Sequence, residues 1–315
     1  MTLPIDAPRS RYSPESPNAP YTSGGTMAVA APTRRRVVTT FAAAFAGAVA
    51  VPAYAQAAER KPGPSPLRRA HAHNDYAHER PLHDALSHGF TSVEADIFLV
   101  EGQLLVAHDP VDLDPSRTLE SLYLAPLAAR IRANHGHVYR GYRRPVQLLV
   151  DIKNDGAAAY LELHRQLRRH RRMLSTYTHG HVRPGAVTAV VSGDRAARVP
   201  LEAQRVRHAF YDGRLDDLAA PSPAPASLIP LISSNWTHSF TWQGAGPFPP
   251  AERARLRAIV TDAHRGGRRV RFWATPDLPG PAREAVWTEL LAAGVDHINT
   301  DDLAGLERFL RKHDA

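Results

Sequence analysis

The sequence predicts a (β/α)8 TIM barrel, formed as a single domain by residues 66–315. Eight short runs typical of β-strands alternate with longer segments in which apolar residues recur at helical spacing, and this alternation is typical of parallel βα units. The segment also has about the length of such a barrel, which is typically ~250 residues. Finally, the polar residues that carry chemistry gather where the first strands end, the position of the active site in this fold.

The eight strand-like runs are rich in β-branched and aromatic residues and are bounded by turn-forming residues. They cover residues 67–72, 92–99, 146–152, 187–193, 207–213, 228–234, 269–275 and 295–301. A further short run, 103–108, follows a Glu101-Gly102 turn and predicts a hairpin appended to the second strand.

The segments between these runs carry apolar residues at i, i+3 and i+4, and several end on Gly, as helices often do. The helical segments cover 80–89, 119–136, 157–174, 250–267 and 281–294, and a last amphipathic helix covers 303–314. The Pro-rich stretch 220–227 predicts a loop between the fifth and sixth strands.

The N-terminal segment resembles an export signal. Arg34, Arg35 and Arg36 precede an apolar run that ends in an Ala-Tyr-Ala step at 53–55, and this order is typical of a cleaved signal peptide. The consecutive arginines favour the twin-arginine route, and hence a bacterial protein secreted to the envelope or beyond. We therefore expect a disordered leader and signal over 1–55 and a linker over 56–65; an uncleaved N-terminal anchor is the alternative.

Composition excludes several functions. The chain has no cysteine, which rules out disulfides, thiolate metal sites and a cysteine nucleophile. Its formal net charge is +8, which is compatible with anionic substrates. The densest basic run, 168–173, lies in a helical segment and predicts a solvated helix face, so no nucleic-acid partner is expected. The oligomeric state is not indicated.

Clustered carboxylates lie on the second and third predicted strands. Glu94 and Asp96 are two residues apart and share a face, and Asp151 lies at the end of the next strand. Three carboxylates buried together need a compensating cation, so they predict oxygen ligands for Mg²⁺ or Ca²⁺. Lys153 would add a positive charge for a phosphate.

Histidines accompany the carboxylates. His71 and His73 end the first strand, and His108 ends the hairpin. Imidazole titrates near neutral pH, so two histidines beside a metal suit acid and base catalysis.

These residues resemble the superfamily of glycerophosphodiester phosphodiesterases and phosphatidylinositol-specific phospholipases C. The shared order is a strand-end His, Gly89, the Glu-x-Asp strand, His108-Asp109 and an acidic residue before x-Lys. The late strand with Trp273 resembles a strand whose Trp lines the substrate pocket. Within the superfamily, "HAHNDY" and "HDPVDLDPSRTLESLYLAPL" are most similar to a fungal branch named for altered inheritance of mitochondria.

The chain departs from the usual motif at Asn74, which replaces the phosphate-binding Arg of the glycerophosphodiesterases. His73-Asn74 with Tyr76 resembles the His-Asn-x-Tyr of eukaryotic phospholipases C, in which the Asn is a calcium ligand, and this favours His73 as the first catalytic histidine. Alignment with the venom sphingomyelinases selects His71 instead, so both stay open.

The resemblance implies a metal-dependent phosphodiester hydrolase. A strand-one histidine would act as base, His108 would protonate the leaving alkoxide, and Lys153, Asn74 and Trp273 would bind substrate. The substrate would be a small or phospholipid phosphodiester, with any membrane contact transient. The headgroup, and whether a cyclic phosphate is released, stay open.

Two alternatives remain. His71-x-His73 also opens the metal sites of amidohydrolases and PHP-type phosphoesterases, although further histidine ligands are scarce on the later strands. Alternatively, the chain is an exported barrel that binds a phosphorylated ligand without catalysis. Trp236 and Trp242, in the loop 235–250, are either pocket walls or loop anchors.

Overall fold

The computed structural model describes residues 63–314, and within them eight parallel strands close into a barrel. The strands follow one another around the barrel in the order β1, β2, β4, β7, β9, β10, β11, β12, and the last pairs again with the first. Their bounds are Leu67–Ala72, Phe90–Val100, Val146–Ile152, Val187–Gly193, Ala209–Gly213, Leu231–Asn235, Arg269–Trp273 and His297–Thr300. The predicted TIM barrel is confirmed.

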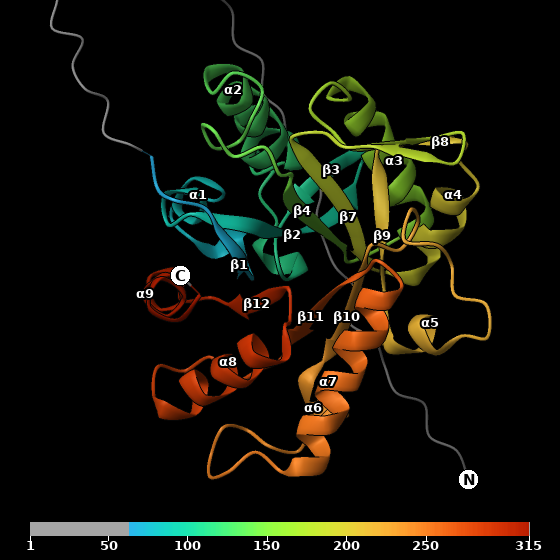
Figure 1. Cartoon of the computed structure of the whole chain (residues 1–315). Coiled ribbons are helices and arrows are strands. Elements are labelled where there is room, and N and C mark those ends of the chain that lie inside the picture. The colour runs from blue at the N-terminus through green and yellow to red at the C-terminus, as the bar shows by residue number, and fades with distance from the viewer. Residues whose placement is uncertain (1–62, 315) are drawn as a thin grey trace, which may run out of the picture. The chain divides into compact units, whose positions relative to one another are not determined.

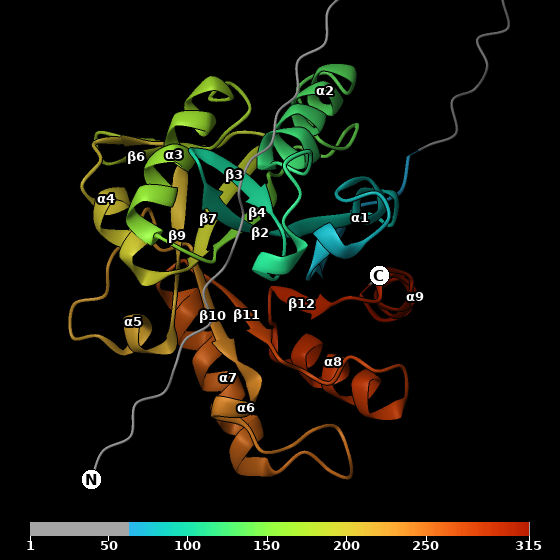
Figure 2. The same cartoon turned by 180° about the vertical axis from the view of Figure 1, so that it is seen from behind.

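Helices follow the strands and lie around them in both views (Figure 1, Figure 2). The main helices are α1 (His83–Ser87), α2 (Ala125–Ala133), α3 (Gly156–Arg169), α4 (Arg198–Glu202), α5 (Leu215–Ala219), α7 (Pro250–Arg265), α8 (Pro281–Ala293) and α9 (Leu303–His313). A short π-helical turn, Glu120–Leu124, leads into α2. No helix among residues 63–314 is long and apolar enough to cross a membrane.

Several local features refine the sequence prediction. The hairpin strand β3 (Gln103–Val106) pairs antiparallel with β2, as predicted. A small separate sheet of β5 (Thr176–Thr178), β6 (His181–Arg183) and β8 (Val206–Arg207) was not predicted, because two- and three-residue strands carry no periodic signal. The Pro-rich stretch 220–227 is a loop.

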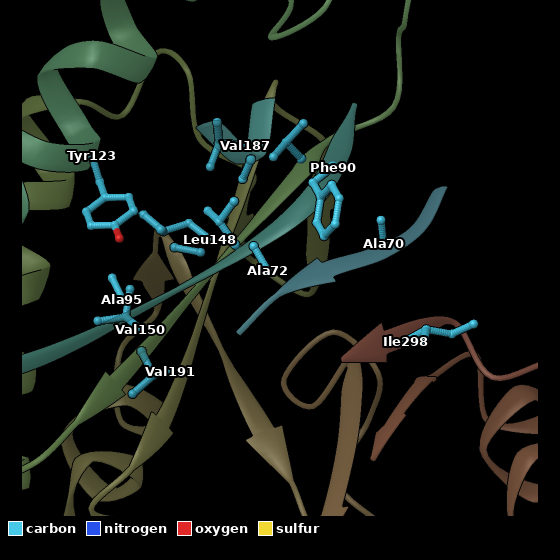
Figure 3. Close-up of a cluster of buried hydrophobic side chains, with 14 of the residues drawn as sticks. Ala70, Ala72, Phe90, Ala95, Tyr123, Leu148, Val150, Val187, Val191 and Ile298 are labelled. Carbon is cyan, nitrogen blue, oxygen red and sulfur yellow. The ribbon is translucent and has the colours of Figure 1, made fainter. Parts of the chain in front are cut away.

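The main core lies between the outer face of the barrel and the helices. Alternate strand residues such as Leu148, Val150 and Val191 point outward and pack against helical side chains such as Tyr123 (Figure 3). Inside the barrel the apolar part is small and separate, formed by Leu149, Val190, Phe210 and Leu231. The period-two alternation of the strands therefore leaves much of the interior to polar side chains.

The loop 235–250 is held by aromatic packing. Within it, α6 (Trp236–Ser239) buries the indole of Trp236 against Phe240 and Phe272, and its Nε1 donates to the carbonyl of Trp242. Trp242 stacks on Phe248. Both tryptophans are thus loop anchors rather than pocket walls.

A buried chain of hydrogen bonds runs along the barrel interior. Arg269 donates to Gln147 Oε1 at 2.7 Å, and Gln147 donates to Ser92 Oγ at 2.8 Å. Ser92 Oγ lies 2.7 Å from His71 Nδ1, and His71 Nε2 lies 3.0 Å from Glu94 Oε2. Burial, followed by the charge of Arg271, lowers the pKa of His71 to about 4, so the ring is neutral at pH 7.

This series of hydrogen bonds determines the tautomer of His71. Because the Gln147 amide donates to Ser92, the serine hydroxyl is free to donate to Nδ1 of His71, and Nε2 then carries the proton that Glu94 accepts. Both ring nitrogens are therefore occupied.

Arg271 supplies the charge that this buried carboxylate needs. Its Nη2 donates to Glu94 Oε2 at 2.6 Å, and its Nε donates to Asn299 Oδ1 at 2.9 Å. Both charged side chains are almost completely buried. Although burial alone would raise the pKa of Glu94, the Arg271 guanidinium holds it well below its usual range.

We predict that Arg271→Met destabilises the barrel by ~3–5 kcal/mol, because it leaves the Glu94 carboxylate buried without its cation. Adding Glu94→Gln should recover a large part of this loss. Urea unfolding measures both effects, with Arg140→Met, at an exposed arginine, as control. An unfolding free energy of Arg271→Met within ~0.5 kcal/mol of the native protein, the range of ordinary surface substitutions, would contradict this account.

Candidate active site

Polar side chains from several strands meet at the carboxyl ends of the barrel strands. The first is His73, directly after β1, whose backbone N–H donates to Thr300 at the end of β12. Its ring Nδ1 lies 2.7 Å from Asp301 Oδ1. Asp301 itself is held by its backbone N–H, which donates to Asp277 at 2.7 Å. The last and first strands thus join to orient one imidazole.

The environment of His73 differs from that of His71. Burial alone would lower the pKa of His73, but the hydrogen bond to Asp301 and the charge of Glu94 outweigh this and raise it above the usual value. With Nδ1–H directed at Asp301, Nε2 is the acceptor nitrogen, and it has no hydrogen-bond partner among residues 63–314. His73 can therefore accept a proton, whereas His71 has no free nitrogen.

His108 lies two residues beyond β3. Its Nδ1 lies 3.1 Å from Asp96 Oδ2 and 3.0 Å from the hydroxyl of Tyr76. More than half of the His108 side chain is exposed. Its Nε2 also has no partner in the described part of the chain, so a second imidazole is oriented through Nδ1 with its other nitrogen available.

Asp96 is the centre of this half of the mouth. Its Oδ2 lies close to three donors, His108, the Tyr76 hydroxyl at 2.6 Å and Lys153 Nζ at 2.9 Å. Its Oδ1 is buried and has no partner among the described residues. Asp96 therefore retains one oxygen that can still bind a cation or a donor.

Lys153 bridges two carboxylates. Its Nζ lies 2.9 Å from Asp96 and 3.0 Å from Asp151, which are register neighbours on β2 and β4. Burial opposes the charge of Lys153, but Asp151 and Asp96 raise its pKa above the usual value. Burial raises the pKa of Asp151. The charge of Lys153 lowers this pKa, but the charges of Asp96 and Glu94 raise it further. Asp96 and Glu94 thus disfavour the ionised form of Asp151, and Lys153 favours it.

The predicted metal ligands Glu94, Asp96 and Asp151 thus lie in one region, but they are held by Arg271 and Lys153. Within residues 63–314 no three His, Asp or Glu side chains converge in an arrangement that holds a metal. The donors nevertheless fit a hard divalent cation, because all are oxygens and Oδ1 of Asp96 is buried without a partner.

The predicted substrate-binding residues Asn74 and Trp273 also lie at the mouth. Asn74, in the left-handed conformation at φ 46°, donates to Asp301 Oδ2 at 3.3 Å and lies 2.6 Å from the Tyr76 hydroxyl. Trp273 ends β11 and is partly exposed.

Residues at the opposite side of the mouth were not predicted. Asp212, on β9, accepts hydrogen bonds from Ser192 at 2.9 Å and from Arg214 at 2.8 Å. Its Oδ1 and the hydroxyl of Ser233 are buried without partners among the described residues. The signal was present, since Ser192 and Asp212 are the penultimate residues of β7 and β9 and Ser233 lies on β10, but these residue types are common in loops.

The chain matches two family models. An AIM6-like phosphodiesterase domain matches residues 65–212, and the glycerophosphoryl diester phosphodiesterase family matches residues 269–304. Both matches include residues of the mouth described above.

Among curated proteins, an altered inheritance of mitochondria protein 6 homolog from Arthroderma benhamiae is 30% identical over 74% of this chain and 81% of its own length. Altered inheritance of mitochondria protein 6 from Eremothecium gossypii is also 30% identical, over 77% of this chain and 69% of its own length.

Among solved structures, an Oleispira antarctica phosphodiesterase in complex with the product sn-glycerol-3-phosphate matches with a TM-score of 0.45 at 13% identity, over 78% of this chain and 97% of its own. A glycerophosphoryl diester phosphodiesterase from Parabacteroides distasonis matches with a TM-score of 0.46 at 14% identity, over 79% and 87%.

The fungal relatives contradict the predicted cellular localisation of the protein. They are proteins of fungi, which points to a eukaryotic cell. The expectation of a bacterial protein secreted by the twin-arginine route is therefore wrong. The arginines and the apolar run on which it depended lie outside the described residues.

The two family models and the 30% identical fungal relative lead to one conclusion: the chain belongs to the AIM6-like phosphodiesterase family and is a phosphoric diester hydrolase.

Proposed function

We propose that the barrel mouth hydrolyses a glycerophosphodiester or a phospholipid headgroup diester with His73 as base and His108 as acid. One observation carries this proposal: two imidazoles on the same mouth are each oriented through Nδ1 by a carboxylate, and each leaves Nε2 for the substrate. Paired in this way, one ring can accept a proton while the other donates one.

In the proposed step, a hydroxyl oxygen attacks the phosphorus while Nε2 of His73 accepts its proton. The hydroxyl belongs to water or to the substrate itself, and the second case first gives a cyclic phosphate. The bond from phosphorus to the leaving oxygen breaks, and protonated His108 gives its proton to the departing alkoxide. Attack by water thus yields an alcohol and a phosphate monoester.

Lys153, Asn74 and Trp273 are proposed to hold the substrate. The Lys153 ammonium lies between the carboxylates of Asp96 and Asp151, and in this proposal it binds a phosphate oxygen of the substrate. The amide of Asn74 and the indole of Trp273 flank the same opening.

A divalent cation, Mg²⁺ or Ca²⁺, is proposed to bind Glu94, Asp96 and Asp151, which supply only oxygen donors. When bound, the ion stabilises negative charge that develops on the phosphate oxygens. The buried Oδ1 of Asp96, which has no partner among residues 63–314, supports this assignment.

The contacts of His71 support this proposal over a metal held by the His71-x-His73 pair. Both nitrogens of His71 are engaged by Ser92 and Glu94, so the paired histidine ligands of an amidohydrolase or PHP-type site are not available. The acid and base pair favours catalysis over passive binding of a phosphorylated ligand.

We predict that His73→Ala and His108→Ala each lower kcat on bis(p-nitrophenyl) phosphate by about 10²–10⁴-fold, the usual contribution of an acid or base. The assay compares EDTA, Mg²⁺ and Ca²⁺. His181→Ala, at an exposed histidine of β6 that precedes the start of β7, is the control. Full activity of both variants, or no turnover by folded native protein with any metal, would contradict the proposal.

A second prediction concerns pH. Because the Asp301 carboxylate raises the pKa of His73, Asp301→Asn should lower it. The base is active only when deprotonated, so the acidic limb of kcat/KM should move to lower pH in this variant. A complete pH profile measures the shift, with the exposed Asp262→Asn as control. An acidic limb that stays in place, or moves to higher pH, would show that His73 is not the titrating base.

A further inference from the structure

A second cavity lies at the opposite, N-terminal end of the barrel. It has a volume of about 530 Å³, within the usual range for small-molecule sites of about 300–1,000 Å³. Its lining comes from the starts of several barrel strands and includes Arg68, Arg69, Arg144, Arg269, His264 and His297. The two carboxylates in the lining are Asp296 and Asp314.

The carboxylates of this cavity already have partners. Asp314 lies 3.3 Å from Arg69, and Asp296 accepts from His264 at 2.8 Å and from the backbone N–H of Val270 at 2.9 Å. The other three arginines have no carboxylate within ion-pair distance among the described residues. The cavity is therefore lined by more positive than negative charge.

Arg269 is the least expected of these arginines. It is partly buried at the floor of the cavity, and its guanidinium donates only to neutral groups, Gln147 at 2.7 Å and His297 Nε2 at 3.1 Å. Burial lowers the pKa of Arg269 below its usual value. The charge of Asp296 opposes this effect of burial, but no carboxylate among residues 63–314 accepts a hydrogen bond from this guanidinium. A guanidinium withdrawn from water is costly unless an anion is bound directly to it.

His297 adds an unused donor. Since Arg269 can only donate, Nε2 of His297 accepts, and Nδ1 must therefore carry the ring proton. This nitrogen is buried and has no partner in the described part of the chain, and the side chain is 2% exposed.

We propose that this cavity binds a phosphate monoester or inorganic phosphate, at a site separate from the catalytic mouth. Guanidinium groups match the planar, paired acceptor geometry of phosphate oxygens. Arg68 and Arg144 at the rim and Arg269 at the floor would surround a dianion. The remaining volume accommodates a small hydroxylated group, for which Asp296 and Asp314 supply acceptors.

The test is isothermal titration calorimetry of the full chain with inorganic phosphate and, separately, with glucose 6-phosphate. The informative variant is Arg68→Gln/Arg144→Gln, because both side chains are exposed and neither makes a hydrogen bond or ion pair with another residue of 63–314, so the fold should persist. We expect this variant to bind about tenfold more weakly or worse. Arg68→Lys/Arg144→Lys, which keeps the charge, should lose only a part of this affinity.

Two comparisons separate this site from other anion binding. Arg172→Gln/Arg257→Gln removes the same charge from exposed positions outside the cavity and should bind as the native protein does. Lys153→Gln removes the lysine of the catalytic mouth. It should leave the binding of phosphate in the cavity at the N-terminal end of the barrel unchanged. Native affinity in Arg68→Gln/Arg144→Gln, or an equal loss in either comparison variant, would overturn the proposal.

Discussion

The buried pairing of Glu94 with Arg271 and His71 is the interaction on which the catalytic end of this barrel depends. A carboxylate enclosed by a β-barrel needs a cation and donors. Glu94, on β2, receives the cation from Arg271 on β11 and a donor from His71 on the neighbouring β1. This contact joins strands distant in sequence. It also holds His71 as a neutral donor, and for this reason the proposed mechanism takes its proton acceptor from His73.

The surroundings of His71 and His73 give the two imidazoles opposite pKa shifts. The two rings are two residues apart on the same face, yet one is enclosed between Ser92 and Glu94 and the other is held from a single side by Asp301. Enclosure lowers the pKa of His71, and the carboxylate raises that of His73. Only the partially solvated ring combines an acceptor nitrogen with access to a substrate.

Sequence reasoning predicted the barrel well, because period-two runs and βα alternation are local signals. Three strands, 67–72, 146–152 and 187–193, match the structure residue for residue. The placement of Glu94, Asp96, Asp151 and Lys153 at one end followed from strand parity. The choice between His71 and His73 could not be made, since it depends on Asp301 and Gln147, distant in sequence. Arg271 was missed although it shares a face with Trp273, because a charge inside a barrel is not expected without its partner.

The central claim is that this mouth cleaves phosphodiesters by general acid and base catalysis at His73 and His108. The most direct measurement is ³¹P NMR of glycerophosphocholine incubated with native protein in ¹⁸O-enriched water. The account predicts conversion of the diester resonance to that of a phosphate monoester containing ¹⁸O, either directly or after a cyclic intermediate. Persistence of the diester with folded protein and saturating Mg²⁺ or Ca²⁺, or cleavage undiminished when both histidines are replaced by Ala, would contradict it.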